Sequence, residues 1–138
     1  MSARFLDLVK HAVSEARRLN MKVVLYDEGM YPSGSAHGMV VEANPDFKSR
    51  GIRRVNDKAE LTDRDTVLFE QEGVCYAEGF TYGTIRGIHF GEDDGEPMAP
   101  KSADLLNAGA VKCFIRLTHD KYYEAVGEHF GHGHRNVH

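Results

Sequence analysis

The chain has only two cysteines among its 138 residues, Cys75 and Cys113, and it contains neither a long apolar run nor a run of lysine or arginine. Two cysteines so far apart indicate neither a disulfide framework nor a zinc-binding pair, and their apolar neighbours favour buried, reduced thiols. The apolar runs fall short of the ~18 residues of a membrane helix, and the N-terminus is charged where a signal peptide is apolar. We therefore expect a cytoplasmic protein that contacts no membrane, and without a cationic run we expect no nucleic acid partner.

The composition is that of an ordinary globular protein, with 41% hydrophobic and 28% charged residues and a net charge of −4. A chain of this length is expected to form a single domain over residues 1–138. Within it, residues 3–50 and 101–131 carry a helical pattern with one strand, whereas residues 51–100 have the character of an antiparallel β insertion. Residues 132–138 are expected to form a flexible tail.

The first part of the chain predicts a helix followed directly by a buried strand. Apolar residues recur every three or four positions over residues 3–20, at Phe5, Leu8, Val9, Ala12, Val13, Ala16 and Leu19. Asn20 is a candidate left-handed stop, and the run MKVVLY at 21–26 is apolar on both faces, as in the middle strands of parallel sheets. Helix then strand is half of a βα repeat. Because this strand lacks parallel neighbours here, we expect a fragment whose exposed strand edges favour a homo-oligomer.

The rest of the chain alternates between helix, strand and loop patterns. A short helix is expected over 36–43, ending where Asn44 precedes Pro45. Alternating segments between 51 and 90 predict antiparallel strands, and the acidic run EDDGEPMAP at 92–100 predicts an exposed loop rather than a calcium site. One helical turn over 102–106 and a long helix over 111–130 complete the prediction.

Two adjacent carboxylates, Asp27 and Glu28, follow the predicted strand. In α/β sheets and barrels ligands bind at the carboxyl ends of the strands, which favours a functional carboxylate. Equally, one acid can cap the following turn while the other pairs with a basic neighbour, and the residues leave both interpretations open. Glycine and proline then fix sharp backbone directions in this loop, and Tyr31 offers an aromatic face to a sugar ring.

The block YDEGMYPSGSAHG at 26–38, together with ADLLN at 103–107 and FIRLTHDKYYEAVGEHFG at 114–131, resembles a segment of large bacterial glycoside hydrolases related to the α-L-rhamnosidases. The resemblance covers most of the chain, with the β region as its weaker part. In those enzymes a similar block follows a strand of a (β/α)8 catalytic barrel. The implied fold class is therefore α+β, a fragment of such a barrel with one helix, a parallel-type strand and two further helices, carrying the antiparallel insertion.

The resemblance also implies which residues meet the substrate. The candidate catalytic residues are Asp27 and Glu28, and the candidate carbohydrate contacts are Tyr26, Tyr31, Ser33, Gly34, His37 and His119. The chain alone is expected to be inactive, for two reasons. A complete barrel takes ~250 residues. Glycoside hydrolysis usually uses two carboxylates that face each other across the bond, whereas adjacent strand positions point to opposite faces.

Histidines form the other candidate cluster. His129, His132, His134 and His138 crowd the C-terminus, but glycines between them favour adventitious metal binding, so we expect no metal site and no cofactor. His119 shares a helical face with Arg116 and Tyr123 at spacings of three and four. That face could line a pocket, or it could be a solvated or packed helix face.

A rival hypothesis is a non-catalytic module that binds carbohydrate or protein through the β region. Aromatic residues in that region alternate with polar ones, at Tyr76, Phe80, Tyr82 and Phe90. They could form a binding surface supported by the helices. The same alternation is also typical of a plain half-buried sheet.

Overall fold

The computed structural model describes residues 1–26, 33–80, 88–89, 92–93 and 100–131. It has a mixed α+β fold. The helices are α1 (Ala3–Arg18), α2 (Met39–Ala43), α3 (Ala108–Leu117) and α4 (His119–Val126), with single 3-10 turns η1 (Pro45–Phe47), η2 (Lys58–Glu60) and η3 (Gly127–His129). The strands are β1 (Arg50–Val55), β2 (Thr66–Gln71), β3 (Val74–Phe80), β4 (Ile88–His89) and β5 (Glu92–Asp93). None of the described helices is long and apolar enough to cross a membrane.

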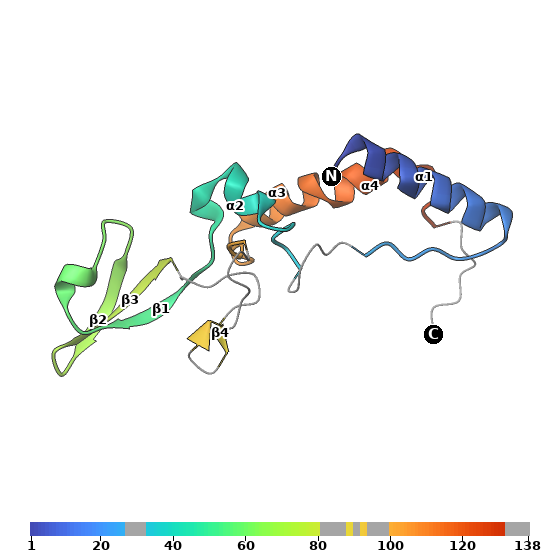
Figure 1. Cartoon of the computed structure of the whole chain (residues 1–138). Helices are drawn as coiled ribbons and strands as arrows, with labels where there is room; N and C mark the ends of the chain where they lie inside the picture. The colour runs from blue at the N-terminus through green and yellow to red at the C-terminus, as the bar shows by residue number, and fades with distance from the viewer. Residues whose placement is uncertain (27–32, 81–87, 90–91, 94–99, 132–138) are drawn as a thin grey trace.

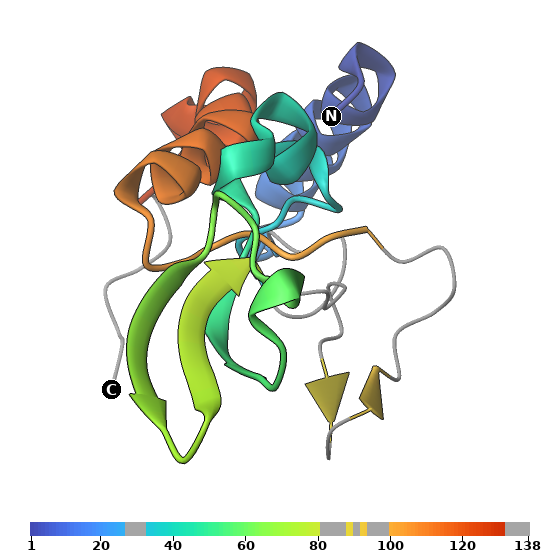
Figure 2. The same cartoon turned by 90° about the vertical axis from the view of Figure 1, so that its left-hand side faces the viewer.

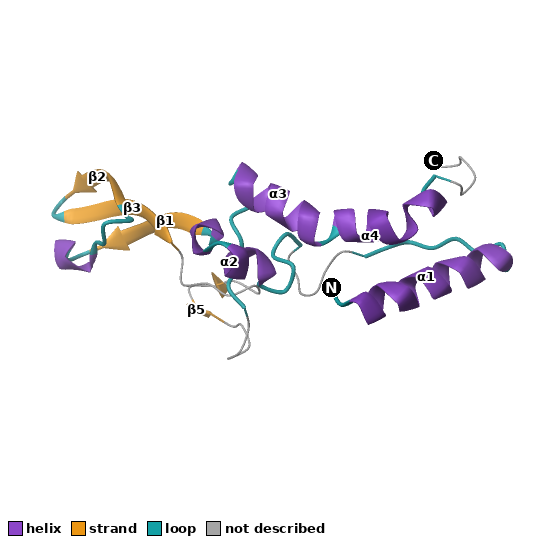
Figure 3. Cartoon of the chain, turned by 90° about the horizontal axis from the view of Figure 1, so that it is seen from above, coloured by secondary structure: helices purple, strands orange, loops and turns teal. Residues whose placement is uncertain are grey.

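The elements follow one another along an elongated molecule. The sheet lies at one end, α1 and α4 lie together at the other end, and α2 and α3 lie between them (Figures 1 and 3). Viewed from the sheet end, the helices lie beyond one end of the β strands and do not cover a face of the sheet (Figure 2). The helical part and the sheet therefore bury their apolar residues separately.

Helix α1 matches the prediction and has well-formed ends. The Ser2 hydroxyl oxygen accepts the Phe5 N–H at 3.2 Å and caps the first turn. At the other end Asn20 has φ 55°, its N–H bonds to the Arg17 carbonyl at 3.0 Å, and the Met21 N–H bonds to the Ala16 carbonyl at 2.8 Å. This pair of bonds is a Schellman motif, so the prediction of Asn20 as the left-handed stop is confirmed.

Residues 21–26 do not form the predicted buried strand. The segment has no strand assignment and runs back from the end of α1, with Val24 89% exposed and Tyr26 72% exposed. A strand that is apolar on both faces needs neighbours on both sides to pair with and layers to cover it, and no described strand of this chain pairs with the segment. The pattern for a strand is present, but its hydrogen-bonding partners are absent from the described residues.

Three helix predictions also need correction. The helix expected over 36–43 begins only at Met39, because Ala36, His37 and Gly38 have left-handed backbone angles. Residues 102–106 form no helical turn; Ala103 instead makes an antiparallel bridge with Lys48.

The long helix expected over 111–130 is interrupted at Thr118. The Thr118 hydroxyl donates to the Phe114 carbonyl at 2.7 Å, and its backbone leaves helical angles at φ −123° and ψ −77°. Threonine bonding back to the preceding turn competes with the regular helix ladder, so α4 starts afresh at His119.

The predicted antiparallel β region is confirmed over residues 50–80. β3 lies in the middle of the order β1-β3-β2 and pairs antiparallel with both neighbours. Glu72 and Gly73 connect β2 and β3 with φ values of 51° and 79°, the type I′ geometry that suits a two-residue hairpin. Of the expected loop at 92–100, the structure describes β5, which pairs with β4, and Pro100. The tail at 132–138 lies outside the described residues.

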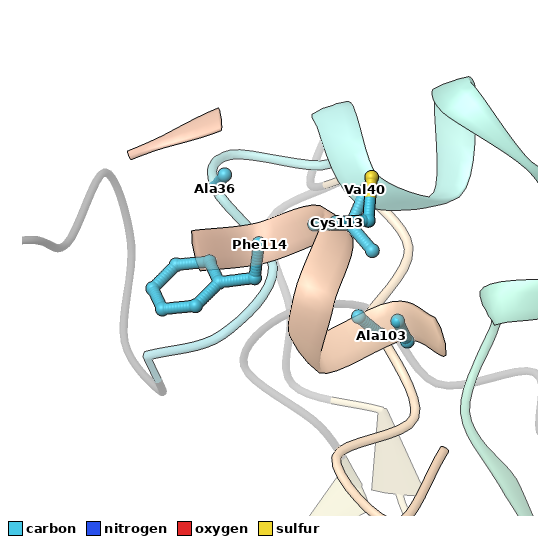
Figure 4. Packing of buried hydrophobic residues seen from close by; sticks show 6 residues of the cluster. Ala36, Val40, Ala103, Cys113 and Phe114 are labelled. Carbon is cyan, nitrogen blue, oxygen red and sulfur yellow. The ribbon is translucent and has the colours of Figure 1, made fainter. Parts of the chain in front are cut away.

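Two small cores hold the described parts together. In the helical part Ala36, Val40, Ala103, Ala110, Cys113 and Phe114 pack into one cluster (Figure 4). Under the sheet, Val55, Cys75 and Ala77 form the second cluster, with Leu61 against it. Both cysteines are buried and unpaired, as predicted.

Candidate functional site

Residues 33–38, which we call the anchored loop, are described in full, and Tyr26 is the other described residue of the block at 26–38. Gly34, Ser35, Ala36 and Gly38 are buried, Ser33 is half-buried and His37 is exposed. Ala36 and His37 have φ values of 48° and 53°, which cost a non-glycine residue about 1–2 kcal/mol each. A loop keeps such angles only where its surroundings impose them, which is a common property of functional loops.

The surroundings are supplied by residues 100–106, which we call the latch segment. The Ser35 hydroxyl oxygen accepts the Ala103 N–H at 2.9 Å, and this bond is buried because Ser35 is 3% and Ala103 6% exposed. At Gly34 an added Cβ would overlap a Leu105 methyl carbon. The latch segment therefore packs directly onto the backbone of the anchored loop.

The latch segment is itself tied to the chain that leads into the sheet. The Ser49 N–H bonds to the Ser102 carbonyl at 2.9 Å, and the two serine hydroxyls lie 2.9 Å apart. The Asp104 N–H bonds to the Phe47 carbonyl at 2.8 Å. These bonds join the residues that precede the β region to the residues that follow it. The two ends of the β region therefore lie close together, beside the anchored loop.

The two candidate histidines sit differently. His37 is exposed at the surface of the anchored loop. The His119 ring lies edge-on to Phe114, with centroids 5.4 Å apart, and its Nδ1 is 2.9 Å from the Thr118 hydroxyl. Because that hydroxyl already donates to Phe114, Nδ1 carries the proton and donates to Thr118. Phe114 belongs to the same buried cluster as Ala36, which links His119 to the anchored loop through the core.

The candidate carboxylates are not part of the described geometry. Asp27, Glu28 and Tyr31 lie outside the described residues, and Tyr26 is exposed at the edge of them. Of the candidate contacts, Ser33, Gly34 and His37 are brought together in the anchored loop. Arg116 and Tyr123, which were predicted to share a helical face with His119, lie on two helices separated by the break at Thr118.

Among the described residues, the carboxylates with shifted pKa values lie in the sheet or in the turn that precedes β2. Hydrogen bonds from Arg53 and from Thr62 lower the pKa of Asp65 from 3.8 to about 2. A hydrogen bond from Arg50 lowers the pKa of Glu78, and one from Lys58 lowers the pKa of Glu70. These ion pairs fasten neighbouring strands and turns, so their role is structural.

The aromatic residues of the sheet make a poor sugar platform. Phe69 and Tyr76 stack on each other with centroids 4.6 Å apart and an angle of 14°, so one face of each ring is covered by the other ring. Phe80 has the Arg50 and Arg64 guanidinium groups over its ring, at 4.9 and 5.7 Å. Tyr82 and Phe90 lie outside the described residues. Sugar binding needs an open ring face, which this arrangement restricts.

No metal site is formed by the described residues, among which no three His, Cys, Asp or Glu side chains gather closely enough. His129 lies 3.5 Å from Glu128 and 3.4 Å from Arg17, and the remaining tail histidines fall outside the described ranges.

Sequence reasoning missed the latch segment, whose signal was Ser35 itself: a hydroxyl residue between Gly34 and Ala36, in a block rich in small residues, needs a hydrogen-bonding partner once it is buried. Comparison of the chain with protein families, curated proteins and solved structures finds no match. The function is therefore argued from the residues of this chain.

Proposed function

We propose that this chain is part of the catalytic domain of a glycoside hydrolase, in which the segment from Tyr26 to His37 contributes carbohydrate contacts. The observation that carries the proposal is the buried hydrogen bond between Ser35 and Ala103. It holds a strained loop in one conformation, in which His37 is exposed and Ser33 is half-buried. Fixed polar groups at a surface loop suit the recognition of sugar hydroxyls.

The exposed segment at 21–26 supports the barrel part of the proposal. Val23 is 47% and Met21 62% exposed, which is unusual for a β-branched, apolar run. Neighbouring parallel strands and outer helices would cover both faces of such a segment in a barrel. Asp27 and Glu28 would then follow the strand at the barrel mouth.

Catalysis is proposed only for the completed domain. The two acids occupy adjacent positions, so a strand at 21–28 would direct them to opposite faces, and hydrolysis uses carboxylates that face each other. We expect no turnover of 4-nitrophenyl α-L-rhamnoside by the isolated chain. Turnover by the isolated chain that disappears in Asp27→Asn would contradict the proposal that catalysis requires the completed domain.

Binding can be tested without turnover by calorimetric titration of the same glycoside. Loss of one sugar hydrogen bond costs about 0.5–1.5 kcal/mol, so His37→Ala should weaken binding by roughly three- to tenfold. His11→Ala, which removes an exposed histidine from α1, is the matched control and should leave the affinity unchanged. Equal affinities for all three proteins would count against a sugar contact at His37.

A further inference from the structure

An open groove lies on the face of α3 that is turned toward η1. It has a volume of about 540 Å³ and is lined by Phe47, Gly109, Lys112, Cys113, Ile115, Arg116 and Asp120. None of these residues belongs to the anchored loop or the latch segment. The groove is therefore separate from the proposed sugar contacts.

The floor of the groove is apolar and close-packed. An added Cβ at Gly109 would lie 2.9 Å from Cε1 of Phe47, so the missing side chain lets the Phe47 ring lie against α3. Cys113 is only 4% exposed, and Ile115 contributes an exposed apolar side chain at 41%. A flat apolar group can rest on this floor.

The polar groups of the groove are mostly cationic. Lys112 and Arg116 are exposed, four residues apart on one face of α3, and neither forms an ion pair within the described part of the chain. Like charges at this spacing destabilise a helix, and a bound anion would relieve the repulsion. The Arg116 Nη2 donates to the Cys113 Sγ at 3.8 Å, which brings the guanidinium over the apolar floor.

Two further features define the ligand charge. The first backbone N–H groups of α3 are already capped, because the Asn107 side chain accepts the Gly109 N–H at 2.9 Å and the Ala110 N–H at 3.4 Å. The side chains, not the helix end, therefore supply the positive charge. Lys112, Arg116 and Asp120 together carry a net charge of +1, which matches a monoanion.

We propose that this groove binds a small organic carboxylate with a flat apolar body. The carboxylate accepts hydrogen bonds from Arg116, whose planar guanidinium suits a two-oxygen acceptor, and is attracted by Lys112. The apolar body packs on Phe47 and Ile115. This site is independent of the proposed sugar contacts.

Phenylacetate is the probe, and amide chemical shifts of the isotope-labelled full chain are the readout. The matched fragments are acetate, which has the charge alone, and 2-phenylethanol, which has the apolar body alone. We expect phenylacetate to shift the amides from Gly109 to Asp120 and to bind about tenfold more tightly than either fragment. Absence of shifts at these amides, or equal binding of either fragment, would overturn the proposal without any variant.

A double variant tests the two cations. Lys112→Gln with Arg116→Gln should weaken phenylacetate binding about tenfold or more, since each charged hydrogen bond is worth roughly that factor. The control, Arg4→Gln with Lys10→Gln, makes the same change of net charge on exposed positions of α1 and should bind as the unaltered chain does. Unchanged affinity in the groove variant, or equal weakening in both variants, would refute the proposal that Lys112 and Arg116 bind the carboxylate.

Discussion

Replacement of Ser35 by alanine tests the link that holds the anchored loop. The change removes the acceptor of the Ala103 N–H, and at this buried position no water can replace it. Leaving a buried donor unsatisfied costs about 1–3 kcal/mol. For a chain of this size that free energy corresponds to a fall in Tm of roughly 3–12 °C.

Urea unfolding and amide hydrogen exchange are the two assays for this variant. The Ala103 amide should lose its protection in Ser35→Ala, because the hydroxyl oxygen that accepts its hydrogen bond is gone. Ser49→Ala is the matched control: Ser49 bonds to Ser102 at 2.9 Å, but both are half-buried and the remaining hydroxyl can turn to water. We expect it to cost less than ~1 kcal/mol. Equal losses of stability in the two variants, with Ala103 still protected in Ser35→Ala, would refute the role given to this bond.

The remaining predictions concern pH and backbone strain. Because the pKa of Asp65 falls from 3.8 to about 2 on folding, the ionised carboxylate stabilises the folded state above pH 4, and this stabilisation is lost as the pH falls toward 2. Urea midpoints should therefore decline over that range, and less so in Asp65→Asn. A decline of equal size in that variant would assign the effect to other carboxylates. Gly38→Ala should destabilise by more than Gly73→Ala, since both have positive φ but an added Cβ at Gly38 meets Pro100 at 2.4 Å while Gly73 is open. Similar unfolding free energies for the two variants would contradict the packing of Pro100 on this loop.

Local patterns predicted much of the fold. The α1 stop at Asn20 was readable, because a left-handed residue at a helix end depends on its immediate neighbours. The antiparallel strands of residues 50–80 were readable for the same reason, since their alternation has a period of two.

What the sequence could not predict depends on distant partners. The run at 21–26 has the composition of a strand, yet strand formation requires a neighbouring strand, which composition does not reveal. The break at Thr118 arises from a side chain bonding to the Phe114 carbonyl, which competes with the helical pattern without altering its apolar period. The latch segment contacts the anchored loop across more than sixty residues of sequence.

In the candidate site too, local features were predictable and contacts with distant residues were not. The glycines of the block indicated sharp backbone directions, which Gly34 and Gly38 show with φ values of 111° and 85°, but they did not indicate the segment that packs on the loop. His119 was grouped with Arg116 and Tyr123 by helical spacing; Tyr123 does share α4 with His119, but Arg116 lies on α3, beyond the break at Thr118. The roles of Asp27 and Glu28 stay predictions.

Contact between the anchored loop and carbohydrate can be measured by mapping amide chemical shifts while the chain is titrated with 4-nitrophenyl α-L-rhamnoside. We expect shifts centred on Ser33 to Gly38 and no shifts in β2 and β3. Shifts centred on Phe69 and Tyr76, or no saturable shift anywhere in the chain, would contradict this expectation.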